Sequence, residues 1–390
     1  MSKKKYLLDP LIFWSVLLLT LFGLIMVISA HASVFTSYGA LKYFFEIGKI
    51  IAFTVFGLFL MNFISKRMNQ TWLNRHVLTI YIIVAIMMIA TLFFPAVNGA
   101  KAWINLKVMT IQPVEFVKIA LIIYLATYFS NSINSNKTAL KLITPPLLVL
   151  SGVFLFIFVL QNDLGSALII VMISLAIFYA VPNKKLRYLK IGSFLLIIIF
   201  LVLFYANGQA LSSWVYSLPD NAPFKSQLLR IAVLFDPLHN VYTSGYQLAN
   251  SLAALTDSFF GHGFGNSTTK FIVPEPYNDA ILSVIVEETG IFGIIVVFGT
   301  YFLIVFQLLN YAVNSLVSLA DSLVLVGIAT FFMAQFFVNI GGMIGVIPMT
   351  GVTLLFISSG GSSIITAFMV IGYAQAIIRK YRSSKNRHAS

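Results

Sequence analysis

Residues 11–28 read LIFWSVLLLTLFGLIMVI, a run without a single charged side chain. A hydrophobic run of about 18 residues or more is typical of a helix that crosses a membrane. Lys3, Lys4 and Lys5 precede it, an arrangement that also occurs in signal peptides. We expect the run to be retained, because it is long and residues 30–32 (AHA) match a cleavage site poorly.

The composition extends this interpretation to the whole chain. Of the 390 residues, 59% are hydrophobic and 9% are charged, and the mean hydropathy is +0.94. A soluble domain carries about 25% charged residues, so a water-soluble globule is excluded. The chain contains no cysteine, which excludes disulfides, thiolate metal sites and a cysteine nucleophile.

Hydropathy predicts an all-α polytopic membrane protein with about ten transmembrane helices, forming one membrane domain over residues 1–390. In the eighth span, Gly290 and Gly293 are expected to bend or break the helix. The predicted spans are 11–30, 45–64, 77–94, 113–130, 143–160, 164–182, 190–206, 279–309, 320–340 and 356–378.

The net charge of +13 is assigned to membrane-flanking loops rather than to nucleic-acid binding. Lysine and arginine concentrate before the first span, near residues 184–190 and in the tail 380–390. The positive-inside rule therefore places both termini in the cytoplasm, with the basic tail facing lipid headgroups. Most of the twelve acidic residues fall on the opposite side, which indicates polar chemistry at the outer face.

Residues 207–278 form the longest polar segment, between the seventh and eighth spans. Its prolines and glycines predict an ordered, turn-rich extracytoplasmic loop with short helices. A loop of this length is usually functional or disordered, and its recurring aromatic residues indicate that it folds back onto the bundle.

Several motifs, in order along nearly the whole chain, resemble the SEDS family (shape, elongation, division and sporulation) of ten-span membrane glycosyltransferases. Departures such as Asn162, Ala102 and Ala280 affect loop positions rather than the acidic residue of the motif. The motif near Asn339 is more similar to division-type (FtsW) members from low-GC Gram-positive bacteria than to elongation-type (RodA) members. The motifs are residues 98–104 (NGAKAWI), 112–118 (QPVEFVK), 161–165 (QNDLG), 245–251 (GYQLANS), 261–267 (GHGFGNS), 274–279 (PEPYND), 339–341 (NIG), 348–351 (PMTG) and 360–363 (GGSS).

The resemblance implies an enzyme that polymerises lipid II at the outer face of the bacterial cytoplasmic membrane during cell division, at the septum. The GlcNAc 4-hydroxyl of one molecule attacks the MurNAc C1 of another, and undecaprenyl pyrophosphate leaves. The resemblance also implies a class B penicillin-binding protein transpeptidase and divisome proteins as partners, besides membrane lipids. Such chemistry needs a carboxylate to take the proton and cations to stabilise the leaving group.

The resemblance places Asp279 at the essential acidic position, and we expect it to be the general base, with Glu275 as a second candidate or helper. An Asp at a helix start can equally be a simple cap. Glu115 and Lys118 share one face of the fourth span. They either line a polar cavity, where the resemblance implies that Lys118 contacts the diphosphate or the sugar, or form a buried pair that locks two helices.

The outer cations Lys101, Arg230 and Lys270 can bind diphosphate or can be interfacial residues. Trp103 is either a sugar-stacking platform or an interfacial tryptophan. By motif position, Gln112, Gln247 and Ser267 are also expected to contact substrate. Asp163 is expected to cap the sixth helix or to make a polar contact between packed helices.

Nothing in the sequence encodes a dedicated metal site, although Mg²⁺ or Mn²⁺ can bridge Asp279 and a diphosphate. Two other functions remain open. A lipid II flippase would also suit a ten-span bundle with an interior ion pair, and a non-catalytic scaffold for a transpeptidase would suit the family's partners.

Overall fold

The computed structural model describes residues 8–68, 70–97, 99–106, 109–133, 135–219, 222, 224–237, 239 and 245–388. Asn98 of the first motif, parts of the large loop and the last two residues of the tail lie outside this set. Among the described residues, nine helices are long and apolar enough to cross a membrane, and a tenth apolar helix, Leu164–Ala180, is shorter. The prediction of an all-α, multi-pass membrane protein with about ten such helices is confirmed.

Helices make up almost all the regular structure, and one short antiparallel hairpin pairs Ile104 with Ile111. The elements are α1 (Pro10–Ala30), α2 (Ala32–Tyr38), α3 (Ala40–Arg67), α4 (Gln70–Ala90), η1 (Thr91–Phe93), β1 (Ile104–Asn105), β2 (Thr110–Ile111), α5 (Pro113–Ser132), α6 (Ala139–Leu155), the π-helical turn η2 (Phe156–Leu160), α7 (Leu164–Ala180), η3 (Lys184–Leu186), α8 (Arg187–Ala206), α9 (Gly208–Ser217), α10 (Lys225–Phe235), α11 (Tyr246–Asp257), α12 (Thr269–Ile272), α13 (Ile281–Ala312), α14 (Leu319–Met343) and α15 (Gly361–His388).

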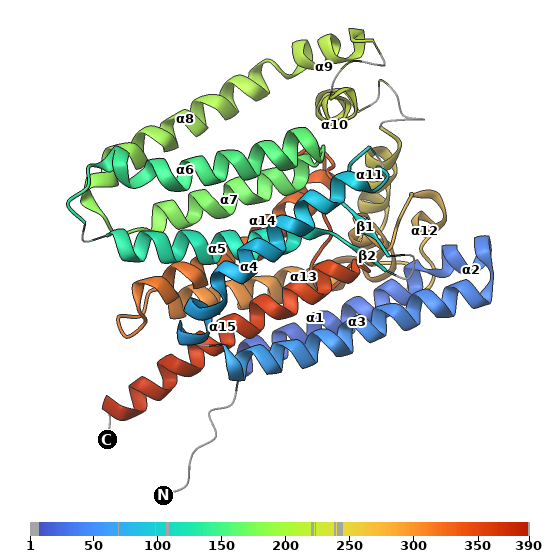
Figure 1. Ribbon diagram of the computed structural model, residues 1–390. Coiled ribbons are helices and arrows are strands. Elements are labelled where there is room, and N and C mark those ends of the chain that lie inside the picture. The colour runs from blue at the N-terminus through green and yellow to red at the C-terminus, as the bar shows by residue number, and fades with distance from the viewer. Residues whose placement is uncertain are drawn as a thin grey trace, which may run out of the picture.

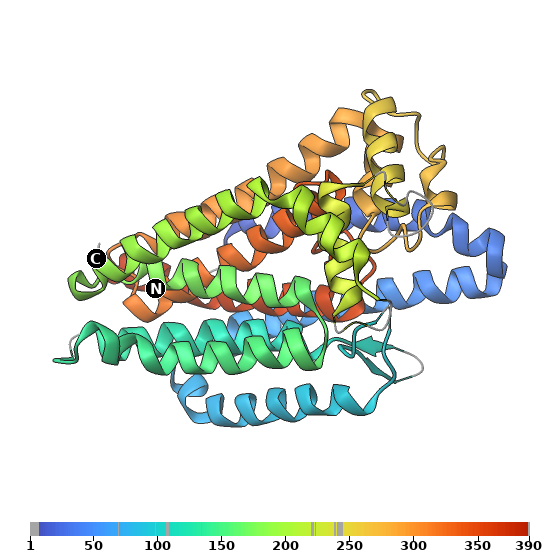
Figure 2. The same cartoon turned by 90° about the horizontal axis from the view of Figure 1, so that it is seen from above.

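The long helices run roughly side by side, so the bundle has two ends (Figures 1 and 2). Helices α9 to α12 and the β-hairpin lie at one end, here called the loop end. Both chain termini lie at the opposite end, here called the terminal end. Among the candidate spans, α5, α14 and α15 are the most buried.

The short helices α9 to α12 all fall between residues 207 and 278. Helix α8, which precedes the loop, lies at the edge of the bundle, and all its side chains stay at least partly exposed (Figure 1). Near the terminal end, Lys190 Nζ donates to the Tyr179 carbonyl at 2.9 Å, and near the loop end Tyr205 donates to the Val346 carbonyl at 2.6 Å.

Several span boundaries differ from the hydropathy prediction, most clearly at two places. The predicted connection over residues 31–44 is largely helical, because α2 prolongs α1 and only Gly39 separates α2 from α3. Gly39 takes φ = 85°, a conformation that lets the chain reverse there. The last span begins at Gly361 rather than at residue 356.

The expected break in the eighth span is confirmed at Gly290, whose φ of 61° and ψ of −143° interrupt α13. A Cβ at this position would lie 2.4 Å from the Phe259 carbonyl oxygen, so only glycine fits. Gly293 lies in regular helix after the break.

The terminal end is held by ion pairs that involve the basic tail. Lys380 lies 2.7 Å from Asp321, and Arg382 pairs with Asp9. Asp9 also accepts a hydrogen bond from the Ile12 amide and so caps α1. Helix α15 thus extends into the basic tail as far as His388. The start of the tail packs on the bundle through these ion pairs.

Candidate active site

A cavity of about 350 Å³ opens at the loop end of the bundle. Polar and charged side chains from segments far apart in the sequence share its walls. The lining residues include His31, Glu46 and Lys49 from the first helices, Trp103, Thr110 and Gln112 around the hairpin, Glu115, Asp163 and Ser166 from α5 and α7, Arg230 from α10, and Glu275, Tyr277, Asn278, Asp279, Thr350 and Gly351 from the segments beside α13 and α14.

Asp279 lies in this cavity, one residue before the N-cap of α13. Its backbone carbonyl accepts a hydrogen bond from Asn339 Nδ2 at 2.8 Å. Gly351 faces the carboxylate, since a Cβ on this glycine would lie 3.7 Å from Asp279 Oδ2. The N-cap of α13 is Ala280, and no side-chain hydrogen bond caps the helix. The geometry therefore favours a cavity-facing carboxylate over a helix cap.

The surroundings of Asp279 set its protonation. Burial raises the pKa of its carboxyl group to about 6, from an ordinary value of 3.8. Hydrogen bonds from its own backbone amide and from the Gln247 side chain oppose this rise, as does the charge of Arg230, whereas Glu275 adds to it. A carboxyl group with a pKa near 6 is well suited to accept a proton at neutral pH.

The neighbours of Asp279 hold the segment before α13 in place. Tyr277 stacks on His31 of the α1–α2 junction with ring centroids 4.1 Å apart. Ser358 donates to the Asn278 carbonyl at 2.6 Å. Glu275 is exposed at the cavity wall and accepts a hydrogen bond from Asn278.

Two cationic side chains line the cavity with Asp279. Arg230 comes from α10 in the large loop, and Lys49 comes from α3. Lys49 forms a 2.6 Å ion pair with Glu46, one helical turn earlier. Since Arg and Lys both bind diphosphate, the cavity combines a carboxylate with anion-binding groups.

Glu115 and Lys118 form a 2.7 Å ion pair on α5, and Glu115 also accepts a hydrogen bond from Gln335 at 3.3 Å. Glu115 lines the cavity, whereas Lys118 is fully buried behind it. The ion pair thus lies within α5, the hydrogen bond from Gln335 links α5 to α14, and Glu115 also lines the cavity.

Gln112 and Trp103 also lie in the cavity wall. Gln112 donates from Nε2 to Asp163 Oδ2 at 3.1 Å. Asp163 accepts from the Ser166 amide at 3.0 Å, so the prediction that it caps α7 is confirmed. It lines the cavity as well.

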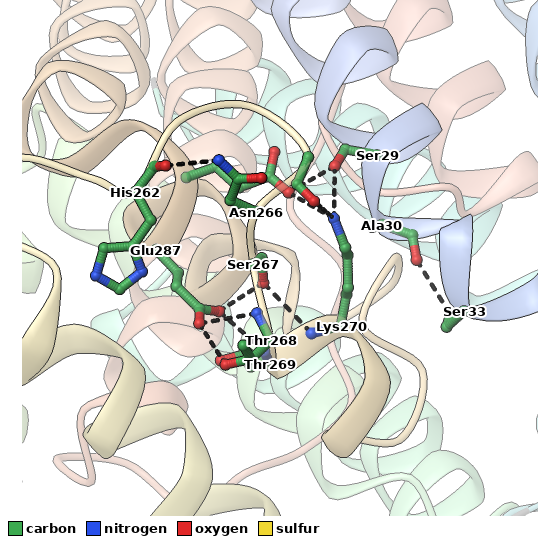
Figure 3. A network of polar contacts seen from close by, with 12 residues as sticks. Ser29, Ala30, Ser33, His262, Asn266, Ser267, Thr268, Thr269, Lys270 and Glu287 are labelled. Carbon is green, nitrogen blue, oxygen red and sulfur yellow. Dashed lines mark hydrogen bonds and ion pairs between the residues drawn. The ribbon is translucent and has the colours of Figure 1, made fainter. Parts of the chain in front are cut away.

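The remaining sequence candidates lie elsewhere. Lys101 is exposed outside the cavity lining, and its backbone amide donates to the Gln161 carbonyl. Ser267 and Lys270 are buried in a separate polar network with Glu287, Glu288 and Ser29 (Figure 3).

Sequence reasoning missed His31, Glu46, Lys49 and Tyr277 as cavity residues. The available signal for Glu46 and Lys49 was a second charged pair at i,i+3 spacing inside a predicted span, the same pattern that drew attention to Glu115 and Lys118.

No group of three or more His, Asp or Glu side chains within the described part of the chain is arranged to hold a metal ion. The cavity does contain more carboxylates than cations, namely Glu46, Glu115, Asp163, Glu275 and Asp279 against Lys49 and Arg230.

Residues 9–383 match the family model described as "Cell cycle protein", which represents FtsW, RodA and SpoVE. The chain is 30% identical to the probable peptidoglycan glycosyltransferase FtsW of Bacillus subtilis, over 97% of this chain and 92% of that one. It is 33% identical to the protein of the same name from Enterococcus hirae, over 77% and 74% of the two chains. It is 31% identical to stage V sporulation protein E of Bacillus subtilis, over 98% and 100%.

Solved structures share the fold. A chain from a peptidoglycan synthase complex, described as coordinating polymerization and crosslinking, superimposes with a TM-score of 0.71 at 21% identity, covering 96% of this chain and 98% of that one. The rod shape determining protein RodA of Thermus thermophilus gives a TM-score of 0.61 at 22% identity, covering 96% and 97%. The protein is thus a multi-pass membrane protein, and it belongs to the FtsW/RodA/SpoVE family.

Proposed function

We propose that this protein is a peptidoglycan glycosyltransferase that polymerises lipid II, with Asp279 as the general base. The observation that carries the proposal is the Asp279 carboxylate in a cavity that it shares with Arg230 and Lys49. Relatives at about 30% identity over most of the chain are named probable peptidoglycan glycosyltransferases, which supports the same class of reaction.

In the proposed reaction, the GlcNAc 4-hydroxyl oxygen of one lipid II molecule attacks the MurNAc C1 of a second. The bond from C1 to the diphosphate oxygen breaks, and undecaprenyl pyrophosphate leaves with the electron pair. Asp279 takes the hydroxyl proton as the new glycosidic bond forms. Because the energy is already in the diphosphate bond, the enzyme has to orient the two sugars and stabilise charge.

Arg230 and Lys49 are the proposed partners of the leaving diphosphate. Arg230 can bind two phosphate oxygens through its planar guanidinium, and Lys49 acts as a point charge. Lys49, which lies 2.6 Å from Glu46, would exchange this carboxylate for phosphate oxygens when the lipid II donor binds. Lys101, exposed near the cavity, is assigned to the approach of the anionic substrate rather than to the reacting centre.

The other cavity residues are assigned to sugar binding. Trp103 offers a ring face for stacking on a sugar, and Gln112 and Glu115 offer hydrogen-bonding groups. Lys118 orients Glu115 through their 2.7 Å contact. Gln247 and Glu275 act on Asp279 itself, the first favouring its ionised form and the second opposing it.

The carboxylates of the cavity also fit a divalent cation, as a further component of the site. Glu115 is compensated by Lys118, but the remaining carboxylates still outnumber the cations of the cavity, and a bound diphosphate would add further negative charge. Mg²⁺ or Mn²⁺, which bind through one carboxylate and phosphate oxygens, would supply charge neutralisation there, held by Asp279.

The proposed setting is the bacterial cytoplasmic membrane at the division septum. The basic residues at the terminal end support a cytoplasmic location for both termini, which puts the cavity at the outer face. A class B penicillin-binding protein and divisome proteins are the proposed partners, supported by the structural match to a peptidoglycan synthase complex.

The deciding experiment supplies purified protein with lipid II, a class B penicillin-binding protein partner and Mg²⁺, and measures glycan strands. We expect strands from the wild type and none from Asp279→Asn, whereas Asp236→Asn, a matched change in the loop outside the cavity lining, stays active. Normal polymerisation by Asp279→Asn would overturn the assignment of the base. Transfer of lipid II across vesicles without polymerisation would replace the proposal with a flippase.

A further inference from the structure

Glu287, on the first half of α13, binds a short segment of the large loop (Figure 3). Its Oε1 accepts hydrogen bonds from the amide and hydroxyl of Thr268 at 2.9 and 2.6 Å. Its Oε2 accepts from the Ser267 hydroxyl at 2.5 Å and from the Thr269 amide at 2.9 Å. Four donors to one buried carboxylate make a strong, directional attachment.

Glu288, the next residue, holds the same segment from another side. Its Oε1 lies 3.0 Å from Lys270 Nζ and accepts a hydrogen bond from the Ser29 hydroxyl of α1 at 2.5 Å. Lys270 Nζ also donates to the Gly265 carbonyl at 2.6 Å. Lys270 and Glu288 are each 2% exposed, so this is a buried ion pair.

The backbone reinforces these attachments at the break in α13. Gly290 interrupts the helix, which leaves helical carbonyls without their usual partners. The amides of His262 and Gly263 donate to the carbonyls of Glu287 and Glu288 at 2.8 and 3.0 Å. The loop therefore completes hydrogen bonds that the helix has lost.

Together these contacts close a loop of the polypeptide, residues 267–287, here called the ring. Ser267 and Glu287 are 20 positions apart and are joined side chain to side chain. Between them the chain passes through α12 and the segment that carries Asp279, then returns through the first two turns of α13. Closing a loop removes conformational freedom from every residue within it, and Asp279 is one of those residues.

We infer that Glu287, Glu288 and Lys270 are positioning residues. They close this ring where its two ends meet and thereby hold Asp279 in the cavity. The inference rests on the proposed function for its catalytic consequence, but the ring itself is a separate, testable feature. Since Lys270 is buried against Glu288 and Gly265 rather than in the cavity wall, it acts on the reaction through Asp279 and not through the diphosphate.

The kinetic test compares Lys270→Met, Glu288→Gln and the double variant, with lipid II as substrate. Each single change should lower kcat, by about 10²-fold if the base moves by about 1 Å, with KM nearly unchanged. The double variant should recover part of kcat, because it leaves no unpaired buried charge. The inference would be overturned if KM rose in both Lys270→Met and the double variant while the kinetic constants of Glu288→Gln stayed normal. Lys270 would then be a substrate ligand.

The matched control is Asp321→Asn, which removes a carboxylate from the 2.7 Å Lys380–Asp321 pair at the terminal end. This variant should keep the kcat of the wild type. If it lost activity as strongly as Glu288→Gln, the effect would be general destabilisation, and the positioning role would be refuted.

A second measurement does not depend on glycosyl transfer. The chain has no cysteine, so Phe271→Cys, at an exposed position of α12 inside the ring, accepts a single nitroxide label. We expect Glu287→Gln and Glu288→Gln to increase label mobility in electron paramagnetic resonance spectra, and Asp321→Asn to leave it unchanged. Unchanged mobility in the Glu287 and Glu288 variants would overturn the ring, even if the wild type polymerises lipid II. An inactive wild type with a mobilised label would instead refute the proposed function alone.

Discussion

Asn339 Nδ2, on α14, donates a hydrogen bond to the backbone carbonyl of Asp279 at 2.8 Å. The same nitrogen donates to the Val352 carbonyl at 2.7 Å. One buried side chain therefore joins the segment that carries the proposed base to the loop that forms the facing wall. The position of Asp279 depends on α14 as much as on its own helix.

Replacing Asn339 with leucine should destabilise the protein and slow glycan synthesis. Two carbonyls would lose their donor, and an unsatisfied buried polar group costs about 1–3 kcal/mol. Thermal unfolding in detergent and the rate of glycan synthesis are the measurements. Asn310→Leu, at an exposed position of α13, should change neither, and an unaffected Asn339→Leu variant would show that the two hydrogen bonds do not hold the site.

The rate of glycan synthesis should rise with pH and reach half its plateau near pH 6. Burial raises the pKa of Asp279 to about 6, so the carboxyl group is increasingly protonated below that pH and cannot take a proton from the sugar hydroxyl. The measurement is kcat/KM as a function of pH, with samples returned to neutral pH to exclude denaturation. A rate that stays constant down to pH 4 would contradict the assignment of Asp279.

Gln247→Leu should shift that midpoint to higher pH. The Gln247 side chain donates a hydrogen bond that lowers the pKa of Asp279 and so favours its ionised form. Without it, the base would be more protonated at neutral pH, and the variant would approach wild-type activity only under more alkaline conditions. A loss of activity that is equal at every pH would mean that Gln247 acts on substrate binding instead.

The membrane architecture could be predicted from the sequence because each span is long, apolar and free of most charges, which is a local property. The break at Gly290 was predictable for the same reason, since a glycine inside a long apolar run weakens the helix locally. The short α2 was not, because residues 32–38 are less apolar and their helix depends on continuing α1 and packing on α3.

The site was predictable only in part. Asp279 and Gln112 were found because their motifs resemble those of a known family, Glu115 was found because it forms a charged pair with Lys118 inside a span, and all three line the cavity. Lys49 was missed because the sequence around it does not show that α3 places it in the same cavity as Asp279. The environment of Lys270 was likewise hidden, since hydropathy cannot distinguish a cation that faces a cavity from one that is buried against Glu288.

The buried pair between Glu115 and Lys118 provides a test of the cavity's inner wall. Glu115→Gln would leave the Lys118 ammonium without its 2.7 Å partner, and breaking a buried pair from one side costs about 3–5 kcal/mol. The combined change Glu115→Gln with Lys118→Met should unfold at a higher temperature than Glu115→Gln alone, because it removes the unpaired charge. Thermal unfolding of the three variants against the wild type measures this. If the single variant were as stable as the wild type, Lys118 would have to be neutral or solvated, and the ion pair within α5 would not contribute to stability.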